Sequence, residues 1–192
     1  MMSDPLPFKE GIRSILSSRT RQTAGDPALR CAAVLVPLLL KKDEWHVLVT
    51  QRTQAVEHHK GQISFPGGAC DPADADLQAT ALRETCEEIG IPPQEVDILG
   101  ALDDMPTISN FVVSPFVGVI PHPFSYRLEP QEVEAAVEVP LSFLQDPARL
   151  RVERREVLGR IHDVLFWDYG PYTIWGATAR ILKNLLDLIP GP

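Results

Sequence analysis

The order of apolar and polar positions predicts several strands early in the chain, one helix near its middle and one at its end. The run CAAVLVPLLL at 31–40 is almost wholly apolar, which suits a buried strand. After a polar turn, HVLVTQR at 46–52 suits its hairpin partner. Pro37 favours an edge or a bulge in the first strand, because proline donates no backbone hydrogen bond. Further strand-like runs lie near 96–102, 111–120, 150–157 and 161–168.

Helical periodicity is clearest at 76–90 and 174–189, where apolar residues recur at helical spacing. Asp74 or Asp76 can cap the start of the first helix. Gly90 suits its end, because glycine accepts the left-handed conformation in which many helices stop. We therefore expect two substantial helices that can cover a sheet.

The segment 53–75 is rich in Gly, Pro, His and Asp and is too long for a simple connection, so we expect it to be functional. Residues 1–27 are expected to form an N-terminal arm with a short helix at 9–18, and residues 28–189 a single domain. A further helical turn fits 140–146. This order of elements predicts an α+β or α/β domain with a mixed sheet between helices.

Composition narrows the class of protein. The chain has 192 residues, 44% hydrophobic and 23% charged, as is ordinary for a globular protein. The sequence contains no apolar run long enough to span a membrane, so we expect no membrane partner. A net charge of −8 argues against nucleic acid as a partner. The three cysteines, Cys31, Cys70 and Cys86, are odd in number and lack C-x-x-C spacing. We expect reduced thiols, no zinc site and a cytoplasmic protein.

The sharpest local signal is a cluster of carboxylates in the helix predicted at 76–90. Glu84, Glu87 and Glu88 fall within an arc of roughly 100°. Like charges at these spacings repel, and the C-terminal end of a helix disfavours anions, so a bound cation would offset the cost. Oxygen ligands alone favour Mg²⁺ or Mn²⁺, and Arg83 can pair with Glu87 at i,i+4. The alternative is a solvated acidic face.

Upstream of this helix, Gly67 and Gly68 follow Pro66. Glycines let the backbone approach a metal or a phosphate closely, although Pro-Gly-Gly is also a common turn.

From Gly68 to Ile91 the sequence resembles the Nudix box, G-x5-E-x7-R-E-U-x-E-E-x-G-U, where U is apolar. The second half matches at Arg83, Glu84, Glu87, Glu88, Gly90 and Ile91. In the first half Gly68 lies one residue too far from Arg83, and the expected glutamate is missing, with Asp74 and Asp76 the nearest acids. The resemblance implies a Nudix-type α/β/α sandwich with a catalytic loop and helix, and hydrolysis of a diphosphate joined to another moiety.

A second resemblance narrows the substrate. The coenzyme A pyrophosphatase branch carries a segment similar to L-L-T-x-R-S-x-x-x-R-x-H-x-G-x-V-x-F-P-G-G, which residues 48–68 match in register, with Glu57 at the spaced arginine. Further similar segments are Ser114–Val117, Glu138–Leu141 and Ile174–Ala179. The resemblance covers about residues 28–189 and implies release of 3′,5′-ADP and 4′-phosphopantetheine.

The resemblance also implies roles for particular residues. Glu84, Glu87 and Glu88 would hold Mg²⁺ or Mn²⁺, with a carbonyl of Gly67 or Gly68 as a further oxygen ligand. The general base would be a box glutamate or an acid of a distal loop, where the candidates are Glu129, Glu132, Glu134 and Glu138. Glu132 fits the distal-loop pattern best; the alternative is a solvated residue in a helical turn.

Substrate contacts are expected from Arg52, His59, Gly61 and Gly67. Arg52 would otherwise form only a surface salt bridge, and His59 only a structural hydrogen bond.

Other residues are expected to be structural. We expect Trp167 and Trp175 to lie in the core, with Trp175 and Gly176 packed tightly at a helix. We expect Asp103 and Asp104 to lie in an exposed turn, unless they reach the metal.

Two other functions stay open. One is hydrolysis of another nucleoside diphosphate derivative, such as ADP-ribose or NADH, and the other is a Nudix-fold binding module without catalysis. The partner is expected to be a small molecule, and the family resemblance allows a homodimer.

Overall fold

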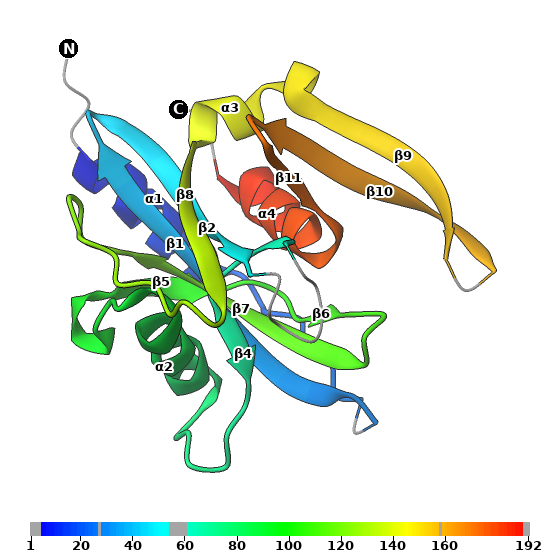
Figure 1. The fold of residues 1–192 in the computed structure, drawn as a ribbon, viewed down its shortest axis with the longest axis horizontal. Helices are drawn as coiled ribbons and strands as arrows, with labels where there is room; N and C mark the ends of the chain where they lie inside the picture. The colour runs from blue at the N-terminus through cyan, green and yellow to red at the C-terminus, as the bar shows by residue number, and fades with distance from the viewer. Residues whose placement is uncertain (1–4, 27, 54–60, 158, 190–192) are drawn as a thin grey trace.

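A sheet that runs through the molecule carries helices on both faces (Figure 1). The computed structural model describes residues 5–26, 28–53, 61–157 and 159–189. The helices are α1 (Pro5–Ser18), α2 (Leu77–Ile89), α3 (Leu141–Gln145) and α4 (Gly176–Leu188), with short 3₁₀ turns η1 (Pro93–Glu95) and η2 (Pro147–Arg149). The strands are β1 (Arg30–Lys41), β2 (Glu44–Arg52), β3 (Ile63–Ser64), β4 (Gly67–Ala69), β5 (Asp97–Ala101), β6 (Met105–Pro106), β7 (Phe111–Val119), β8 (Val133–Pro140), β9 (Leu150–Val157), β10 (Arg160–Tyr169) and β11 (Tyr172–Trp175).

The main sheet is mixed, as expected. Its strand order is β3-β2-β1-β7-β5, with β4 also pairing β1, β6 pairing β7 and β8 pairing β2. The β1–β7 pair is parallel, whereas the other pairs of this sheet are antiparallel. The expected hairpin of the first two strands is confirmed, and it turns through Lys42 and Asp43 at positive φ (51° and 62°), which matches the twist of antiparallel strands.

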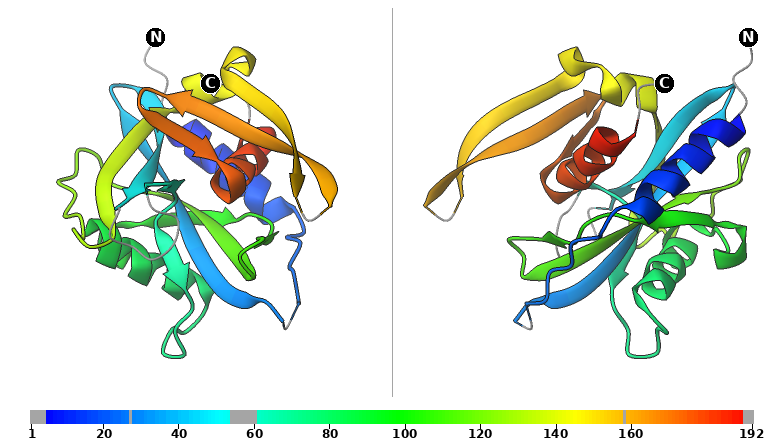
Figure 2. Two further views of the ribbon diagram at one scale, coloured as in Figure 1. Left: turned by 45° about the vertical axis from the view of Figure 1, so that its right-hand side comes forward. Right: turned by 180° about the vertical axis from the view of Figure 1, so that it is seen from behind.

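Two apolar clusters fill the spaces between the layers. On one face, Ala81 and Ile89 of α2 pack against Leu35, Leu39 and Leu48 of the sheet. The other face is covered by α1 and α4 (Figure 2), through residues that include Ile12, Leu16, Leu182 and Leu185. The α/β/α expectation is therefore confirmed. No helix in the described ranges has both the length and the apolar character needed to cross a bilayer.

The second sheet was not anticipated. Strands β9, β10 and β11 pair with one another and not with the main sheet, and Figure 1 shows the β9–β10 hairpin projecting from the body of the molecule. Trp167 and Ile174 pack its inner face into the same cluster as α4. The last helix begins at Gly176 rather than 174, because Gly176 has φ +66° and Trp175 still pairs with Phe166 of β10.

Trp175 is not a core residue, so that expectation is wrong, whereas Trp167 is buried as expected. Trp175 stacks on Phe166 with ring centroids 6.1 Å apart and keeps 36% of its surface exposed. A Cβ at Gly176 would meet nothing within 4 Å, so this glycine serves the backbone turn and not tight packing.

Pro37 lies in the central strand of the main sheet, and the expected edge position is wrong. On one side of β1 the pairing with β4 ends at Val34↔Gly67, and the pairing with β2 begins at Leu38↔Val47. Pro37 falls between these two partners, so the donor that proline lacks costs no ladder hydrogen bond.

Asp103 and Asp104 hold the N-terminal segment against the domain, so the expected exposed turn is wrong. Asp103 accepts from Arg19 and from the Gln22 N–H, and Asp104 accepts from Arg21 and from the Ala24 N–H. The residues between 19 and 24 are therefore fixed by ion pairs to the loop after β5.

Cys31 and Cys70 form a disulfide, so the expectation of three reduced thiols is wrong. Their neighbours Ala32 and Ala69 pair in the β1–β4 register, which brings the two Cα atoms to 5.5 Å. The Cys70 N–H also donates to the Cys31 carbonyl at 3.2 Å. Cys86 is free and partly buried in α2.

Reduction of the disulfide should lower the free energy of unfolding by about 4 kcal/mol, because it releases a loop with a sequence separation of 39 residues. Urea unfolding with and without a dithiol reductant measures the change. Cys31→Ser should match the reduced protein, and Cys86→Ser should match the oxidised one. A Cys31→Ser protein as stable as the oxidised wild type would contradict this prediction.

Candidate functional site

Helix α2 carries the glutamates and is capped as its sequence predicts. The Asp76 side chain accepts from the Ala79 N–H at 2.8 Å, satisfying one of the free N–H groups of the first turn. Gly90 ends the helix at φ 78°, and its N–H donates to the Cys86 carbonyl. These two ends fix which turns of the helix carry the carboxylates.

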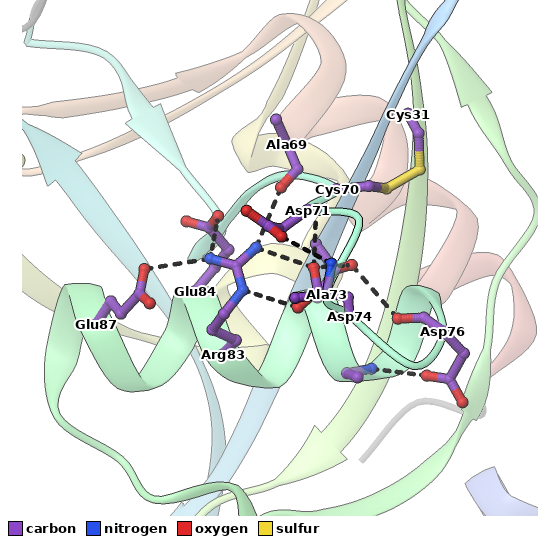
Figure 3. Close-up of polar contacts among 12 residues, drawn as sticks. Cys31, Ala69, Cys70, Asp71, Ala73, Asp74, Asp76, Arg83, Glu84 and Glu87 are labelled. Atoms are coloured by element: carbon purple, nitrogen blue, oxygen red, sulfur yellow. Dashed lines mark hydrogen bonds and ion pairs between the residues drawn. A yellow bond between two sulfur atoms is a disulfide. The ribbon is translucent and has the colours of Figure 1, made fainter.

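The three glutamates of α2 lie in very different surroundings. The Glu87 side chain is 61% exposed, that of Glu84 16% and that of Glu88 only 3%. The Arg83 guanidinium lies beside the first two, and its Nη1 donates to Glu84 at 2.8 Å and to Glu87 at 3.2 Å (Figure 3). The expected Arg83–Glu87 pair is therefore present, and the uniformly solvated acidic face is not.

Glu88 is a buried carboxylate with too few partners. The Gly67 N–H donates to it, and Arg52 Nη1 lies 3.9 Å from Oε1. Its Oε2 has no hydrogen-bond partner within the part of the chain that the structure describes. Burial raises the pKa of Glu88 to about 8, which Arg52 opposes and the charges of Glu132 and Glu84 reinforce. Such a group needs a proton or an additional cation.

Two glycines of β4 bring backbone against these carboxylates. A Cβ at Gly68 would lie 2.5 Å from the Glu84 carboxylate, so only glycine leaves that group in place. Gly67 has φ +151°, and a Cβ there would lie 2.4 Å from the Ala33 carbonyl oxygen. The Pro-Gly-Gly segment is thus part of a strand at the carboxylates, not a free turn.

Asp74 completes the network and is the residue that the spacing analysis did not resolve. Arg83 donates to its two carboxylate oxygens at 2.8 and 3.0 Å, and Thr80 donates to it at 2.7 Å (Figure 3). Arg83 also donates to the Ala69 carbonyl. The hydrogen bond from Arg83 holds the pKa of Asp74 well below its usual range.

A signal for Asp74 was present in the sequence. Asp74 is the sixth residue after Gly68, which is where G-x5-E places its acid, and eight residues rather than seven then precede Arg83. The turn at 71–76 absorbs the additional residue, so the shorter acid still reaches the guanidinium.

Glu132 lies at the end of an exposed turn immediately before β8. Its charge adds to the effects that raise the pKa of Glu88 and, after burial, of Glu84, and the Glu129 N–H binds the Glu88 carbonyl, so Glu132 lies near the carboxylate cluster. Glu138 does not, because it is bound on β8 by Lys41 at 2.7 Å and Tyr126 at 2.9 Å. Glu129 uses its side chain to accept the Gln131 N–H.

The expected substrate contacts are only partly described. Arg52 ends β2 with its Nε buried and without a partner in the described ranges. The Gly61 N–H donates to the Arg52 carbonyl at 3.1 Å. His59 and Glu57 lie outside the described residues.

The carboxylates do not form a ready-made cage. Across residues 5–26, 28–53, 61–157 and 159–189, no three His, Cys, Asp or Glu groups are gathered closely enough to hold a metal ion. Arg83 accounts for this at Glu84 and Glu87, since it binds one oxygen of each. The unpartnered Glu88 oxygen and the oxygen-only donor set still fit a hard divalent cation.

Comparison with known proteins shows the family to which the chain belongs. The NUDIX domain family model matches residues 29–161. A protein named "Uncharacterized Nudix hydrolase NudL" from Enterobacter sp. (strain 638) is 42% identical over 159 residues, which cover 81% of each chain. A protein of the same name from Cronobacter sakazakii is 37% identical over 188 residues, which cover 96% of each chain.

A solved structure shows the same fold. The MutT/nudix family protein from Enterococcus faecalis superposes with a TM-score of 0.57 at 14% identity, over 96% of this chain and 74% of that chain. With a family model that matches more than half of its length and relatives of this identity, the chain belongs to the Nudix hydrolase family.

Proposed function

We propose that this Nudix hydrolase cleaves the diphosphate of coenzyme A or a derivative, in the presence of Mg²⁺ or Mn²⁺. Water adds to one phosphorus, the P–O–P bond breaks, and the products are 3′,5′-ADP and a 4′-phosphopantetheine species. The observation that carries the proposal is that residues 48–68, which resemble the coenzyme A branch, end in the backbone that contacts Glu84 and Glu88.

The metal would be held by Glu84, Glu87 and Glu88, with the Gly68 carbonyl as a further oxygen ligand. Arg83 leaves one oxygen of Glu84 and one of Glu87 outside its own hydrogen bonds. When bound, a divalent ion supplies positive charge against phosphate oxygens and makes water easier to deprotonate. Asp74 and Arg83 fix the orientation of Glu84 and Glu87, and the carboxylates would have to move together to enclose the ion.

Two other side chains would act on the substrate and the water. Glu132, beside the carboxylates, takes the proton from the attacking water. Arg52, whose side chain is 26% exposed, turns its guanidinium toward a diphosphate oxygen, which gives its buried, unpartnered Nε an acceptor. Phosphoryl transfer depends mainly on such placement and electrostatics.

The segments that resemble the coenzyme A branch meet in space. Ile63 of β3 pairs with Gln51 of β2, and its carbonyl accepts from the Thr178 hydroxyl of α4 at 3.1 Å. The start of α4, within 174–179, thus lies beside the strands that lead to the carboxylates. This supports one substrate surface formed by both segments.

A hydrolysis panel read by product mass tests the proposal. Coenzyme A, acetyl-coenzyme A, ADP-ribose, NADH and a nucleoside triphosphate are compared with Mg²⁺, with Mn²⁺ and with EDTA. Metal-dependent release of 3′,5′-ADP from coenzyme A or its acetyl form, well above the other rates, is expected. Preferred turnover of ADP-ribose or NADH would overturn the substrate, and no turnover would favour a binding module.

Asp74→Asn should lower kcat/KM by about 10- to 100-fold, because it weakens the group that holds Arg83 against the metal-site glutamates. Asp76→Asn is the matched control, since asparagine caps a helix as well as aspartate does. Steady-state kinetics on the preferred substrate of the panel measures both. Equal losses in the two variants would show that Asp74 acts only on the stability of the helix.

A further inference from the structure

Thr53 joins the end of β2 to the turn that carries Glu132. Its N–H donates to the Glu132 carbonyl at 2.9 Å, and its hydroxyl donates to the Gln131 carbonyl at 2.8 Å. The residue is 9% exposed, so both hydrogen bonds are shielded from competing water. A buried side-chain hydrogen bond therefore holds this surface turn.

The same turn also has hydrogen bonds within itself and one to helix α2. The N–H groups of Glu132 and Val133 both donate to the Glu129 carbonyl, at 3.0 and 2.8 Å. The Glu129 N–H donates to the Glu88 carbonyl at 2.9 Å. The turn thus spans the gap between β2 and the C-terminal end of α2, with Thr53 as its anchor on the β2 side.

Glu132 itself is exposed, so no packing fixes its backbone. The β2–β8 ladder is also irregular here, with a register shift between Gln51 and Arg52 just before Arg52 pairs with Val133. At this break the Thr53 hydroxyl adds a hydrogen bond that most side chains cannot make. The backbone hydrogen bond would survive a substitution, whereas the hydroxyl bond would not.

We propose that the Thr53 hydroxyl is a positioning group that holds the turn at 129–133 so that Glu132 faces the glutamates of α2. The inference rests on the proposed function, in which Glu132 is the general base. Thr53 touches neither substrate nor water in this role and acts only through the turn. It gives the site a specific link between the substrate strand β2 and the base.

Thr53→Val tests this, because it removes the hydroxyl and keeps the branched shape. It should lower kcat about tenfold with KM within about twofold, and Thr53→Ser should recover most of the rate. Thr107→Val is the matched control: its hydroxyl also donates to a carbonyl, that of Phe111, in the β6–β7 turn away from α2 (Figure 1). It should leave kcat unchanged.

A double-mutant cycle identifies the residue through which Thr53 acts. In a Glu132→Gln background Thr53→Val should cause no further loss, whereas in an Arg52→Gln background its tenfold loss should persist. An undiminished loss in the Glu132→Gln background, a change in KM alone, or a Thr53→Ser variant as slow as Thr53→Val would overturn the inference.

Amide hydrogen exchange separates this inference from the proposed function. The Glu132 and Val133 amides should exchange about tenfold faster in Thr53→Val than in wild type or Thr53→Ser. Unchanged exchange overturns the positioning role whatever the substrate. A wild-type protein that hydrolyses nothing in the panel overturns the proposed function, whereas a fully active Glu132→Gln variant overturns the role of Glu132 and the inference drawn from it.

Discussion

Glu88→Gln is expected to abolish metal-dependent hydrolysis and, at the same time, to stabilise the metal-free protein at alkaline pH. Glutamine keeps the size of the side chain and removes the charge that a metal ion would bind. The loss of a metal ligand corresponds to several kcal/mol of transition-state stabilisation, or on the order of 10³-fold in kcat. Single-turnover kinetics at saturating Mg²⁺ or Mn²⁺ measures this loss.

The stability effect follows from burial. The pKa of Glu88 rises from 4.5 to about 8 because the side chain is buried. The folded protein therefore holds the proton more tightly than the unfolded chain. The free energy of unfolding therefore falls as the pH rises from about 4.5 to about 8. Above about pH 8 Glu88 is ionised in both states, and the free energy of unfolding falls no further on its account. A shift of this size corresponds to about 5 kcal/mol.

Thermal melts in EDTA between pH 5 and pH 9 measure this cost. The wild type should lose stability across that interval more steeply than Glu88→Gln, and saturating Mg²⁺ or Mn²⁺ should restore the wild type alone. Glu87→Gln is the control, because its side chain is 61% exposed and its removal should leave the pH dependence of stability unchanged. A Glu88→Gln protein with the wild-type pH dependence would show that Glu88 is not the buried charge.

Adjacent glycines should give opposite results. Gly68→Ala is expected to lower metal affinity and kcat strongly while the protein stays folded. Its new Cβ would lie 2.5 Å from the Glu84 carboxylate, which is the flexible end of a side chain and can move aside. Gly67→Ala is expected to destabilise the protein instead, since φ is +151° and the Cβ would meet the Ala33 backbone oxygen at 2.4 Å.

Mn²⁺ titration, melting temperature and kcat are measured on both variants. We expect Gly68→Ala to melt within a few degrees of wild type and to lose at least tenfold in Mn²⁺ affinity. Gly67→Ala should melt well below wild type. A Gly68→Ala protein with normal metal affinity would show that Glu84 does not need its observed position.

The sequence by itself determined the features that depend on short stretches of chain. Helix α2 has its cap at Asp76, its glycine stop at Gly90 and an apolar side at regular spacing, so its limits were predicted to within a residue. The β1–β2 hairpin and the arc of Glu84, Glu87 and Glu88 are local in the same sense. Periodicity and capping act over a few residues, and a pattern can therefore reveal them.

Features that join distant residues were decided by the tertiary structure. The Cys31–Cys70 disulfide depends on the β1–β4 register, and Pro37 is tolerated in a central strand only because two partners end on either side of it. Strand β8 was not predicted, because the spacing of its polar residues also fits a helical turn. Pairing with β2 in the folded molecule selects the strand.

The same distinction applies within the site. The sequence identified three equivalent glutamates, but only packing buries Glu88 and leaves Glu87 in solvent. It placed Asp74 one residue out of step with Arg83, and only the folded turn at 71–76 closes that gap. Local free energies specify where an element begins and ends, whereas burial, charge and partner depend on chain segments that meet only in the folded molecule.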